Sequence, residues 1–585
     1  MQYPKIPLAQ TIVQLCKAKS IKHIIISPGS RNAPLTIGFT NDNYFTCYSI
    51  VDERCAAFFA LGIAQKLQQP TAVVCTSGSA MLNYYPAVAE AFYSDIPLVV
   101  LSADRPKYLI SIGDGQTINQ PDVYKNHILY STNLKQDLGN SKNQAKEHES
   151  SIIENLENKL ERFLEIEHKI QEENEEEINR ALNIAIHKKG PVHINIPFDE
   201  PLYETTDTLS VNPKVISVKI QPKPIDFDDI ESYSKTWSDA SKKIVLVGVN
   251  QLGSVEQIYL NKLANDDSII VFIETTSNLH HPEFFPSIDK MIAPFSDEEF
   301  KQLQPDILLT FGGLIVSKKV KAFLRTFKPK HHWHIDEKKA NDTFFCLEKH
   351  FETSPNKFFE EFLPRVMTNN SSFKPFFKTL KRHREEKHQE YIKQIPFCDF
   401  KVFDSVLKSI PNNTSLQISN SSAIRYAQLF NLNKTLEIHC NRGTSGIDGS
   451  MSTAIGFAVS NTNQTTFITG DLSFFYDSNA LWNNYIPSNF RIIVVNNSGG
   501  GIFRILPGDK NSKNFDTFFE TKHKLTAIQL CKMYGFNYSK AEVEDELNLM
   551  LNSFFIESDS PKLLEVFTPN EINDEVLLNY FKFIK

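Results

Sequence analysis

The sequence predicts an α/β protein with three doubly wound parallel-sheet domains, and three observations lead to that fold class. Short apolar runs alternate with longer amphipathic stretches in three successive blocks, which is typical of parallel sheets covered by helices. Many of the apolar runs end in Gly, Ser, Asp or Asn, the residue types expected where ligands bind beyond the carboxyl ends of strands. A chain of 585 residues is also too long for a single hydrophobic core.

The apolar runs are the expected strands of the three sheets. Each is short and almost continuously apolar, as a strand buried on both faces should be. The first block contains Ile21–Ser27, Pro70–Cys75, Ile96–Ser102 and Val192–Ile196, the second contains Lys243–Val249, Ser268–Glu274 and Asp306–Phe311, and the third contains Ser415–Ser419, Thr465–Thr469, Arg491–Val495 and Lys562–Phe567.

Composition shifts suggest where the domains begin and end. We expect the first domain over residues 1–202, the second over 203–353, a mostly charged helical linker over 354–400 and the third domain over 401–585. Within the first domain, residues 142–179 form a Glu- and Lys-rich insertion with apolar positions spaced as in a solvated helix or helical hairpin. We favour that structural reading of the insertion over an interaction surface.

Charge and composition narrow the class of protein. The 62 basic and 69 acidic side chains give a net charge of −7, which argues against a nucleic-acid-binding protein, because such proteins usually carry a basic face. The eight cysteines are scattered singly, which favours a reducing compartment. No signal peptide and no uninterrupted run of about 20 apolar residues is apparent, so we expect a soluble cytoplasmic protein with no membrane partner.

The most informative motif lies at two strand ends. The run Ile468–Thr469 stops at Gly470-Asp471-Leu472-Ser473, and the run Ile492–Val495 stops at Asn496-Asn497. A hard cation such as Mg²⁺ prefers oxygen ligands like the Asp471 carboxylate and the Asn497 amide oxygen, completed by backbone carbonyl, water and phosphate oxygens. The pair therefore predicts a metal-bridged pyrophosphate.

Arginine and acidic residues at other strand ends are weaker signals. Ser30 and Arg31 follow the first strand, and an Arg at this place can bind a carboxylate through two hydrogen bonds. An ordinary turn at the start of a helix explains the same residues. Glu53 begins an Ala-rich helix, where an acidic residue also complements the helix dipole. Arg425 and Arg442 lie beside flexible strand-end loops and suit a dianionic substrate, with a purely structural role as the open alternative.

Two groups of histidines are weaker evidence for a metal site than the Asp471–Asn497 pair. His280-His281 and His331–His334 lack the Cys or carboxylate partners and the regular spacing of a zinc site. The second group leads into Ile335-Asp336, which resembles a strand end, so we read these histidines as structural.

In combination, the motifs resemble those of the thiamine-diphosphate-dependent enzymes over nearly the whole chain. The Gly-Asp…Asn-Asn pair is similar to the diphosphate-binding motif of that superfamily, with Leu472 at the position that is usually Gly. Within the superfamily, the match is closest to the 2-succinyl-5-enolpyruvyl-6-hydroxy-3-cyclohexene-1-carboxylate (SEPHCHC) synthases of menaquinone biosynthesis. The segments that carry the resemblance are SPGSRNAPLT (27–36), DERCAAFFALG (52–62), TSGSAMLNYYPAVAEA (76–91), SADRP (102–106), NRGTSGIDG (441–449), GDLSFFYDSNAL (470–481) and VVNNSGGGIFRILP (494–507).

The resemblance implies a role for each domain and for particular residues. The three domains become pyrimidine-binding, central and pyrophosphate/Mg-binding domains, with Glu53 as the catalytic residue that holds the aminopyrimidine ring. Asp471, Asn497 and the Gly499 carbonyl become ligands of Mg²⁺, for which Mn²⁺ is a possible substitute. The remaining cofactor contacts are Ile447, Gly470, Leu472 and Ser473, and the substrate contacts are Ser30, Arg31, Arg105, Gln116, Lys318, Ser421, Arg425, Arg442 and Phe503.

The resemblance also implies a reaction and an assembly. The enzyme would be a transferase that decarboxylates 2-oxoglutarate and adds the resulting succinyl-semialdehyde carbanion equivalent to isochorismate. Active sites in this family lie between subunits, so a homodimer or homotetramer follows. The alternatives are another thiamine-diphosphate carboligase or decarboxylase, such as an acetolactate synthase-like enzyme, and a non-catalytic cofactor-binding relative.

Overall fold

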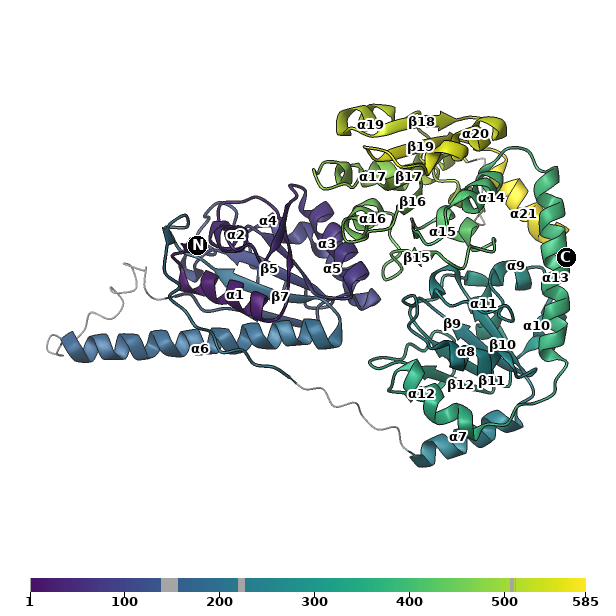
Figure 1. Cartoon of the computed structure of the whole chain (residues 1–585), viewed down its shortest axis with the longest axis horizontal. Coiled ribbons are helices and arrows are strands. Elements are labelled where there is room, and N and C mark those ends of the chain that lie inside the picture. The colour runs from purple at the N-terminus through teal and green to yellow at the C-terminus, as the bar shows by residue number, and fades with distance from the viewer. Residues whose placement is uncertain (1, 138–155, 219–226, 506–509, 511) are drawn as a thin grey trace. The chain divides into compact units, whose positions relative to one another are not determined.

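The computed structural model describes residues 2–137, 156–218, 227–505, 510 and 512–585, with only the backbone for 156–164 and 227–229. Its three large sheets are parallel throughout and carry helices, which confirms the predicted α/β class (Figure 1). The chain divides into two compact units. The first comprises Met1–Ile220, Asp448–Thr462 and Asp477–Ile486, and the second comprises Gln221–Ile447, Asn463–Tyr476 and Pro487–Lys585. The domain bounds expected from the sequence stay a prediction.

The first unit is built on a sheet with strand order β3-β2-β4-β5-β7-β6. Its strands are β2 (His23–Ile26), β3 (Thr46–Ser49), β4 (Thr71–Cys75), β5 (Leu98–Asp104), β6 (Tyr130–Asn133) and β7 (Val192–Pro197), and β1 (Tyr3–Pro4) pairs antiparallel with β8 (Thr205–Thr206). Its helices are α1 (Pro7–Ala18), α2 (Ala33–Thr40), α3 (Glu53–Leu67), α4 (Ser79–Asn83), α5 (Tyr85–Ser94), α6 (Leu156–Lys188) and α16 (Ser450–Val459), with short turns η1 (Lys107–Leu109) and η6 (Ser478–Leu481).

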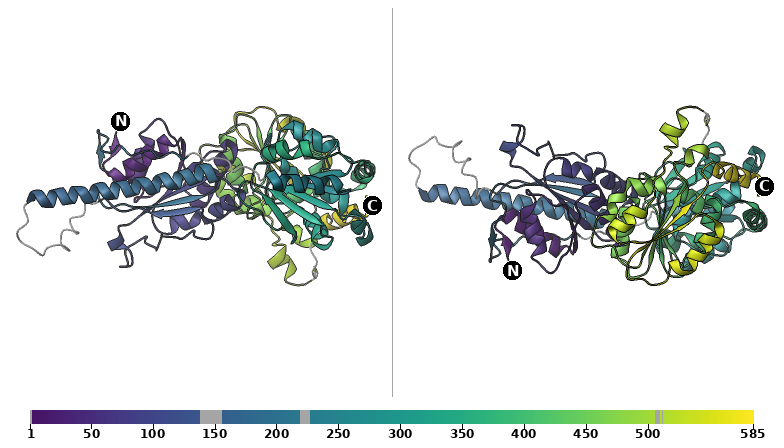
Figure 2. Two further views of the ribbon diagram at one scale, coloured as in Figure 1. Left: turned by 90° about the horizontal axis from the view of Figure 1, so that it is seen from below. Right: turned by 90° about the horizontal axis from the view of Figure 1, so that it is seen from above.

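Two helices of the first unit show how its sequence sets the fold. Helix α3 begins after Asp52, whose carboxylate caps the helix by accepting a hydrogen bond from the Cys55 N–H at 3.2 Å. Helix α6 packs on α1, β6 and β7 and then extends beyond the sheet of this unit (Figure 2). It includes the part of the predicted charged insertion from residue 156 on, while residues 142–155 lie outside the described residues.

The second unit holds two sheets, of which the central one has strand order β10-β9-β11-β12-β13. Its strands are β9 (Lys243–Val247), β10 (Ile269–Ile273), β11 (Ile307–Phe311), β12 (His331–Ile335) and β13 (Leu347–Phe351). The helices and turns around it are α7 (Phe227–Asp239), α8 (Gln257–Ala264), η4 (Thr275–Ser277), α9 (Ile288–Ile292), α10 (Asp297–Leu303), α11 (Lys318–Thr326), α12 (Pro355–Phe362), η5 (Leu363–Arg365) and α13 (Phe373–Gln394). The histidine run is strand β12, and its His332 and His334 rings contact the Thr310 hydroxyl at 3.0 and 2.7 Å.

The C-terminal sheet has strand order β15-β14-β16-β17-β19-β18. Its strands are β14 (Ser415–Ile418), β15 (Glu437–His439), β16 (Thr465–Gly470), β17 (Phe490–Asn496), β18 (Asn537–Ala541) and β19 (Lys562–Phe567). Its helices and turns are α14 (Asp399–Ser409), α15 (Ser422–Ala427), α17 (Asp471–Tyr476), α18 (Ile502–Ile505), η7 (Phe515–Phe519), α19 (Ile528–Tyr534), α20 (Glu544–Phe554) and α21 (Asn573–Phe583). Every strand predicted from an apolar run is present. Among the helices of the described residues, none has the length and apolar character needed to cross a membrane.

Candidate functional site

The predicted metal ligands lie at the ends of two paired strands. Strands β16 and β17 run in parallel with Gly470 opposite Val495, so the residues that follow them emerge at one edge of the sheet. Asp471 begins α17 and is 2% exposed. Its Oδ1 accepts a hydrogen bond from the Leu472 N–H at 2.7 Å and its Oδ2 accepts one from the Gly499 N–H at 3.0 Å. The carboxylate is therefore fixed by backbone donors and points along the loop that follows β17.

Asn497 presents an amide oxygen that its surroundings do not satisfy. Its Nδ2 donates to Asp399 Oδ2 at 2.9 Å, whereas its buried Oδ1 has no hydrogen-bond partner among the described residues. A buried acceptor without a partner costs free energy unless something fills the site. A hard cation is a suitable occupant, because the neighbouring donors are a carboxylate and backbone carbonyls. The residues present therefore fit a Mg²⁺ ion.

Two glycines shape this edge of the sheet. A Cβ at Gly470 would meet no atom within 4 Å, so there is room beside the strand end. Gly499 has φ of +158°, and a Cβ there would lie 2.7 Å from the Glu520 carbonyl oxygen, which excludes larger residues. The Gly499 carbonyl accepts from the Gly501 N–H at 3.0 Å and keeps a second lone pair. The geometry thus has space for an anionic group next to the metal ligands.

The other predicted cofactor residues of the second unit gather at the same loop. Ser473 donates its hydroxyl hydrogen to the Ile447 carbonyl at 2.7 Å, which ties α17 to the glycine-rich segment 441–449. Sequence reasoning missed His523, whose Nε2 lies 3.2 Å from Asp471 Oδ2. His523 Nδ1 accepts from the Leu525 N–H at 3.1 Å, so a neutral ring carries its proton on the nitrogen that faces Asp471. No motif signals His523, because only the fold brings it to the site.

A pair of arginines marks the basic part of the second unit. Arg442 donates through NH1 to Asn420 Oδ1 at 2.6 Å, and Asn420 in turn donates to the carbonyls of Asn441 and Gly446 at 2.7 and 2.8 Å. Asn420 therefore holds the glycine-rich loop in place. Burial lowers the pKa of Arg425, and the nearby charge of Arg442 lowers it further. The two positive charges repel each other, and a bound dicarboxylate would relieve that repulsion.

The remaining predicted substrate residues of this unit are Ser421, Lys318 and Phe503. Ser421 has φ of +67° and its carbonyl accepts from Arg425 NH1 at 2.7 Å. Lys318 is exposed at the start of α11. Phe503, on α18, is 38% exposed and its ring lies 6.0 Å from that of Phe519 in an edge contact. The contacts of Lys318 with the other site residues stay a prediction.

In the first unit, Glu53 is the first residue of α3 and is half-buried. Its Oε2 accepts a hydrogen bond from Asn83 Nδ2 at 3.4 Å. The cap that Asp52 provides fixes the start of the helix and so fixes where Glu53 projects. The carboxylate keeps lone pairs that can accept a hydrogen bond from a further donor.

The predicted anion-binding residues of the first unit follow β2 and β5. Arg31 is 7% exposed, donates through NH1 to the Phe198 carbonyl at 3.1 Å and has its NH1 3.4 Å from Glu200 Oε1. Burial lowers the pKa of Arg31, and the charge of Arg105 lowers it further. Arg105 donates from Nε to Asp114 Oδ2 at 2.5 Å and from NH1 to Ser77 Oγ at 3.2 Å. The two guanidinium groups therefore influence each other electrostatically.

Ser30 and Gln116 complete this part of the prediction. Both are exposed, and Gln116 has φ of +54°. Gly78 approaches its backbone, since a Cβ at Gly78 would lie 3.0 Å from the Gln116 carbonyl oxygen. The turn after β4 and the loop after β5 thus meet at these residues.

A buried polar network beneath these loops was not expected from the sequence. Asn195 donates to Asp104 Oδ2 at 2.8 Å, Gln120 donates to Asn195 Oδ1 at 2.7 Å, and the Gly78 N–H donates to Gln120 Oε1 at 2.9 Å. Burial raises the pKa of Asp104. The network joins the ends of β5 and β7 to the turn after β4, so it supports the loops that carry Arg105 and Gln116.

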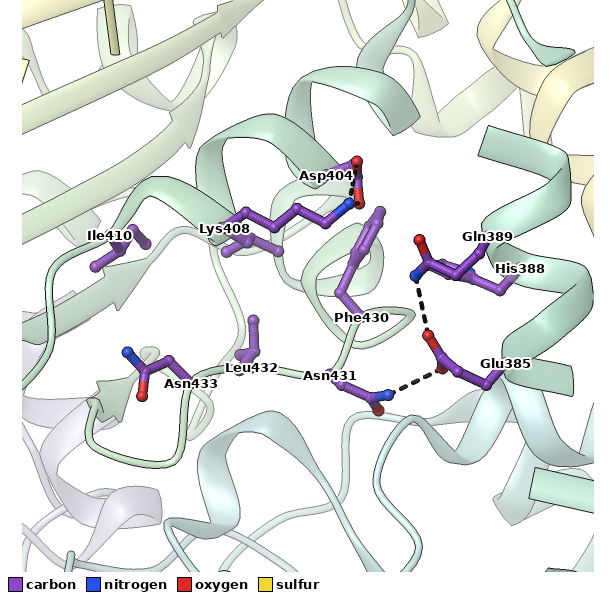
Figure 3. A pocket seen from close by; sticks show the side chains of 11 residues that line it. Glu385, His388, Gln389, Asp404, Lys408, Ile410, Phe430, Asn431, Leu432 and Asn433 are labelled. Carbon is purple, nitrogen blue, oxygen red and sulfur yellow. Dashed lines mark hydrogen bonds and ion pairs between the residues drawn. The ribbon is translucent and has the colours of Figure 1, made fainter. Parts of the chain in front are cut away.

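A separate cavity of the second unit carries none of the predicted site residues. It has a volume of about 270 Å³ and is drawn in Figure 3. Several of its polar groups bond to one another. Glu385 accepts from Gln389 at 3.0 Å and from Asn431 at 2.9 Å, and Lys408 pairs with Asp404 at 2.7 Å. Because these donors and acceptors are already paired, we assign the cavity no part in catalysis.

Comparison with known proteins identifies the family. The thiamine pyrophosphate enzyme N-terminal TPP-binding domain matches residues 6–125, the middle domain of thiamine pyrophosphate enzymes matches 229–418, and the C-terminal TPP-binding domain matches 420–566. The chain is 56% identical over 590 residues to a 2-succinyl-5-enolpyruvyl-6-hydroxy-3-cyclohexene-1-carboxylate synthase of Christiangramia forsetii, and 55% identical over 582 residues to that of Flavobacterium psychrophilum. Both matches cover 100% of this chain and 100% of the relative.

Solved structures agree on the fold. A benzoylformate decarboxylase from Polynucleobacter necessarius superimposes with a TM-score of 0.68 at 14% identity, covering 97% of this chain and 99% of that one. A putative thiamin diphosphate-dependent enzyme of Mycobacterium smegmatis gives 0.67 at 14% identity, covering 96% and 99%. At such identities the likeness shows the fold alone, and the full-length relatives decide the family. The chain belongs to the 2-succinyl-5-enolpyruvyl-6-hydroxy-3-cyclohexene-1-carboxylate synthase family of thiamine pyrophosphate enzymes.

Proposed function

We propose that this chain catalyses the decarboxylation of 2-oxoglutarate and the 1,4-addition of the remaining four-carbon unit to isochorismate, giving SEPHCHC and carbon dioxide in menaquinone biosynthesis. The activity for which the full-length relatives are named supports this reaction. The observation that carries it is the Asp471–Asn497 pair, with its unsatisfied buried amide oxygen at the edge of the C-terminal sheet. That edge suits a metal-bound diphosphate, which the cofactor of this family contains.

The metal and the diphosphate would be held by the loops after β16 and β17. Asp471, Asn497 and the Gly499 carbonyl would be the protein ligands of Mg²⁺, and Mn²⁺ would bind through the same oxygen ligands. Backbone groups from Gly470 to Ser473 would hold the diphosphate, and Ile447 would support the cofactor from below. When bound, thiamine diphosphate supplies the carbon nucleophile and electron sink that no side chain offers.

Glu53 would act on the pyrimidine ring. Its carboxyl group would share a hydrogen bond with a ring nitrogen and so favour the tautomer that can remove a proton. The Asn83 contact leaves the second oxygen of Glu53 available for this bond. The role of Glu53 is therefore to hold a proton at a defined position.

The arginines would recognise the substrates. Isochorismate and 2-oxoglutarate are both dicarboxylates, and each unit of the chain offers two guanidinium groups that influence each other electrostatically. Arg31 and Arg105 would act with Ser30 and Gln116. On the second unit, the corresponding residues would be Arg425 and Arg442 with Ser421 and Lys318, and Phe503 would shape the apolar wall.

The assembly belongs to the same proposal. We infer a homodimer or homotetramer, located in the cytoplasm, with active sites at subunit interfaces. Large apolar side chains are exposed on the lone chain near the predicted metal site, since Phe518 is 74%, Phe519 50% and Tyr476 53% exposed. Such side chains commonly mark a protein interface.

A coupled assay tests this proposal. The purified protein with thiamine diphosphate and Mg²⁺ should release carbon dioxide from 2-oxoglutarate and form SEPHCHC only when isochorismate is present. Glu53→Gln should fold normally but lower kcat by about 10²–10⁴-fold, because the general acid–base group is lost. Product identification by mass spectrometry is the measurement, and Glu360→Gln, an exposed change, is the control.

Three results would contradict the proposal. Turnover of pyruvate in preference to 2-oxoglutarate would favour an acetolactate synthase-like enzyme or a decarboxylase. Absence of cofactor binding after reconstitution would favour a non-catalytic relative. Full activity of Glu53→Gln would remove the role assigned to Glu53.

A further inference from the structure

Asp399, the first residue of α14, lies directly behind the predicted metal ligand Asn497. It is 3% exposed, and its two carboxylate oxygens have separate partners. Oδ2 accepts from Asn497 Nδ2 at 2.9 Å, and Oδ1 accepts from the Thr568 hydroxyl at 2.6 Å. The backbone N–H of Asp399 donates to Asn573 Oδ1 at 2.9 Å. Asp399 is thus held from two further elements, the end of β19 and the start of α21.

The chemistry of this contact decides which way the Asn497 amide faces. The oxygen and nitrogen ends of an amide have nearly the same shape, so packing alone distinguishes them poorly. An ionised carboxylate accepts hydrogen bonds and donates none, so it turns Nδ2 toward itself. The Oδ1 atom then faces the opposite way and has no partner among the described residues. Only the oxygen end of the amide can bind a cation.

We propose that Asp399 is a positioning residue that fixes the amide of Asn497 so that its oxygen faces the metal. This inference rests on the proposed function, because it assumes the Mg²⁺ site. Asp399 would touch neither metal nor substrate, and its effect would pass through Asn497. Thr568 and Asn573 hold Asp399 but do not contact that amide in the contacts described above.

Replacing the carboxylate tests the orientation. In Asp399→Asn, the new amide can donate to Asn497 Oδ1, so Asn497 can turn its nitrogen toward the metal. We expect the affinity for Mg²⁺, measured by calorimetric titration in saturating thiamine diphosphate, to fall about 10–100-fold, as for other lost partners of metal ligands. Thr568→Val is the matched control, since it removes a hydrogen bond to the same carboxylate and leaves the acceptor for Asn497. Its affinity for Mg²⁺ should stay close to that of the wild type.

An exchange of the two residues separates orientation from stability. In the double variant Asp399→Asn with Asn497→Asp, the amide is at position 399 and the carboxylate is at position 497. The carboxylate then faces the metal, so an oxygen ligand is restored. We expect this variant to bind Mg²⁺ more tightly than Asp399→Asn, and far-ultraviolet circular dichroism without metal should show that both are folded. Equal Mg²⁺ affinity in the wild type and Asp399→Asn, or equally weak binding in Thr568→Val, would overturn the inference.

Failure of the inference can be told from failure of the proposed function. If the wild type binds no thiamine diphosphate at any Mg²⁺ concentration, the proposed function fails. If the wild type binds the cofactor with Mg²⁺ and Asp399→Asn binds it equally well, only the role of Asp399 fails. If Asp399→Asn alone does not fold, the test is the double variant Asp399→Asn with Asn497→Asp. If that variant folds but does not bind Mg²⁺, the positioning role of Asp399 is overturned.

Discussion

At the scale of single residues, Glu274 is a buried acid of the second unit whose charge interacts with that of Arg442. It follows β10, is 3% exposed, and accepts hydrogen bonds from the N–H groups of Val316 and Ser317 at 2.6 and 2.7 Å. Burial raises the pKa of Glu274 to about 7, even though these two donors and Arg442 act in the opposite direction. The carboxylate connects the start of α11 to Arg442 electrostatically, so its charge state affects a predicted substrate residue.

This pKa gives a prediction about stability and pH. The folded protein binds the Glu274 proton more tightly than the unfolded chain, whose pKa is about 4.5, so this group stabilises the fold least at high pH. As pH rises from about 4.5 to 7, the free energy of unfolding of the wild type should fall by up to about 3 kcal/mol. The Glu274→Gln variant should not show this fall. Melting temperatures from pH 5 to 8 check this, with the exposed Glu360→Gln as control. A gap between wild type and Glu274→Gln that does not change with pH would contradict the assignment.

The same scale shows how far the sequence could identify the site. Asp471 and Asn497 were predictable because each directly follows an apolar strand, and polar residues at that point face the ligand edge of a parallel sheet. Asp399 and His523 were not. Each reaches its partner only through folding, so no local pattern of residue types indicates the contact.

At the scale of elements, helices α3 and α16 make an unusually close contact in the first unit. A Cβ at Gly62 would lie 2.0 Å from the Thr453 carbonyl oxygen, and a Cβ at Gly456 would lie 2.0 Å from the Phe59 carbonyl oxygen. Glycine at these positions lets the two backbones approach. Because Glu53 begins α3, the contact also sets where that carboxylate lies.

Replacing one of these glycines should therefore separate the helices. Gly456→Ala places a methyl group against the Phe59 carbonyl, and we expect it to lower the free energy of unfolding by about 2–4 kcal/mol, as strong overpacking does. Differential scanning calorimetry measures the loss. Gly115→Ala is the control, because a Cβ there meets nothing within 4 Å. If both variants melt at the wild-type temperature, the close helix contact is wrong.

The fold was predictable where strands are central and less so at the edges of the sheets. Central strands such as β4 and β17 are buried along their whole length, so their sequences are continuously apolar. The edge strands β3 and β18 include exposed positions and read TCYS and NYSKA, which no apolar run distinguishes from a loop. A strand could therefore be predicted from the sequence when both of its faces are buried.

At the scale of the whole molecule, the predicted catalytic groups belong to different parts of the chain. Glu53 lies in the first compact unit and Asp471 in the second. Under the proposed assembly, one active site combines Glu53 of one subunit with Asp471 of another. Each subunit then contributes to two sites, and a defect in one residue affects only one of them.

Mixed dimers of two inactive variants test this arrangement. Glu53→Gln and Asp471→Ala should each be nearly inactive as homodimers, Asp471→Ala because it loses a carboxylate ligand of the metal. In a heterodimer, purified through a different tag on each subunit, one site carries both changes and the other carries neither, so about half of the wild-type turnover should return. The measurement is isochorismate-dependent carbon dioxide release per dimer. The control is a mixture of the two homodimeric variants under conditions in which subunits do not exchange. If both residues came from one subunit, every site of the heterodimer would lack one of them, and its activity would stay as low as that of the two variants alone.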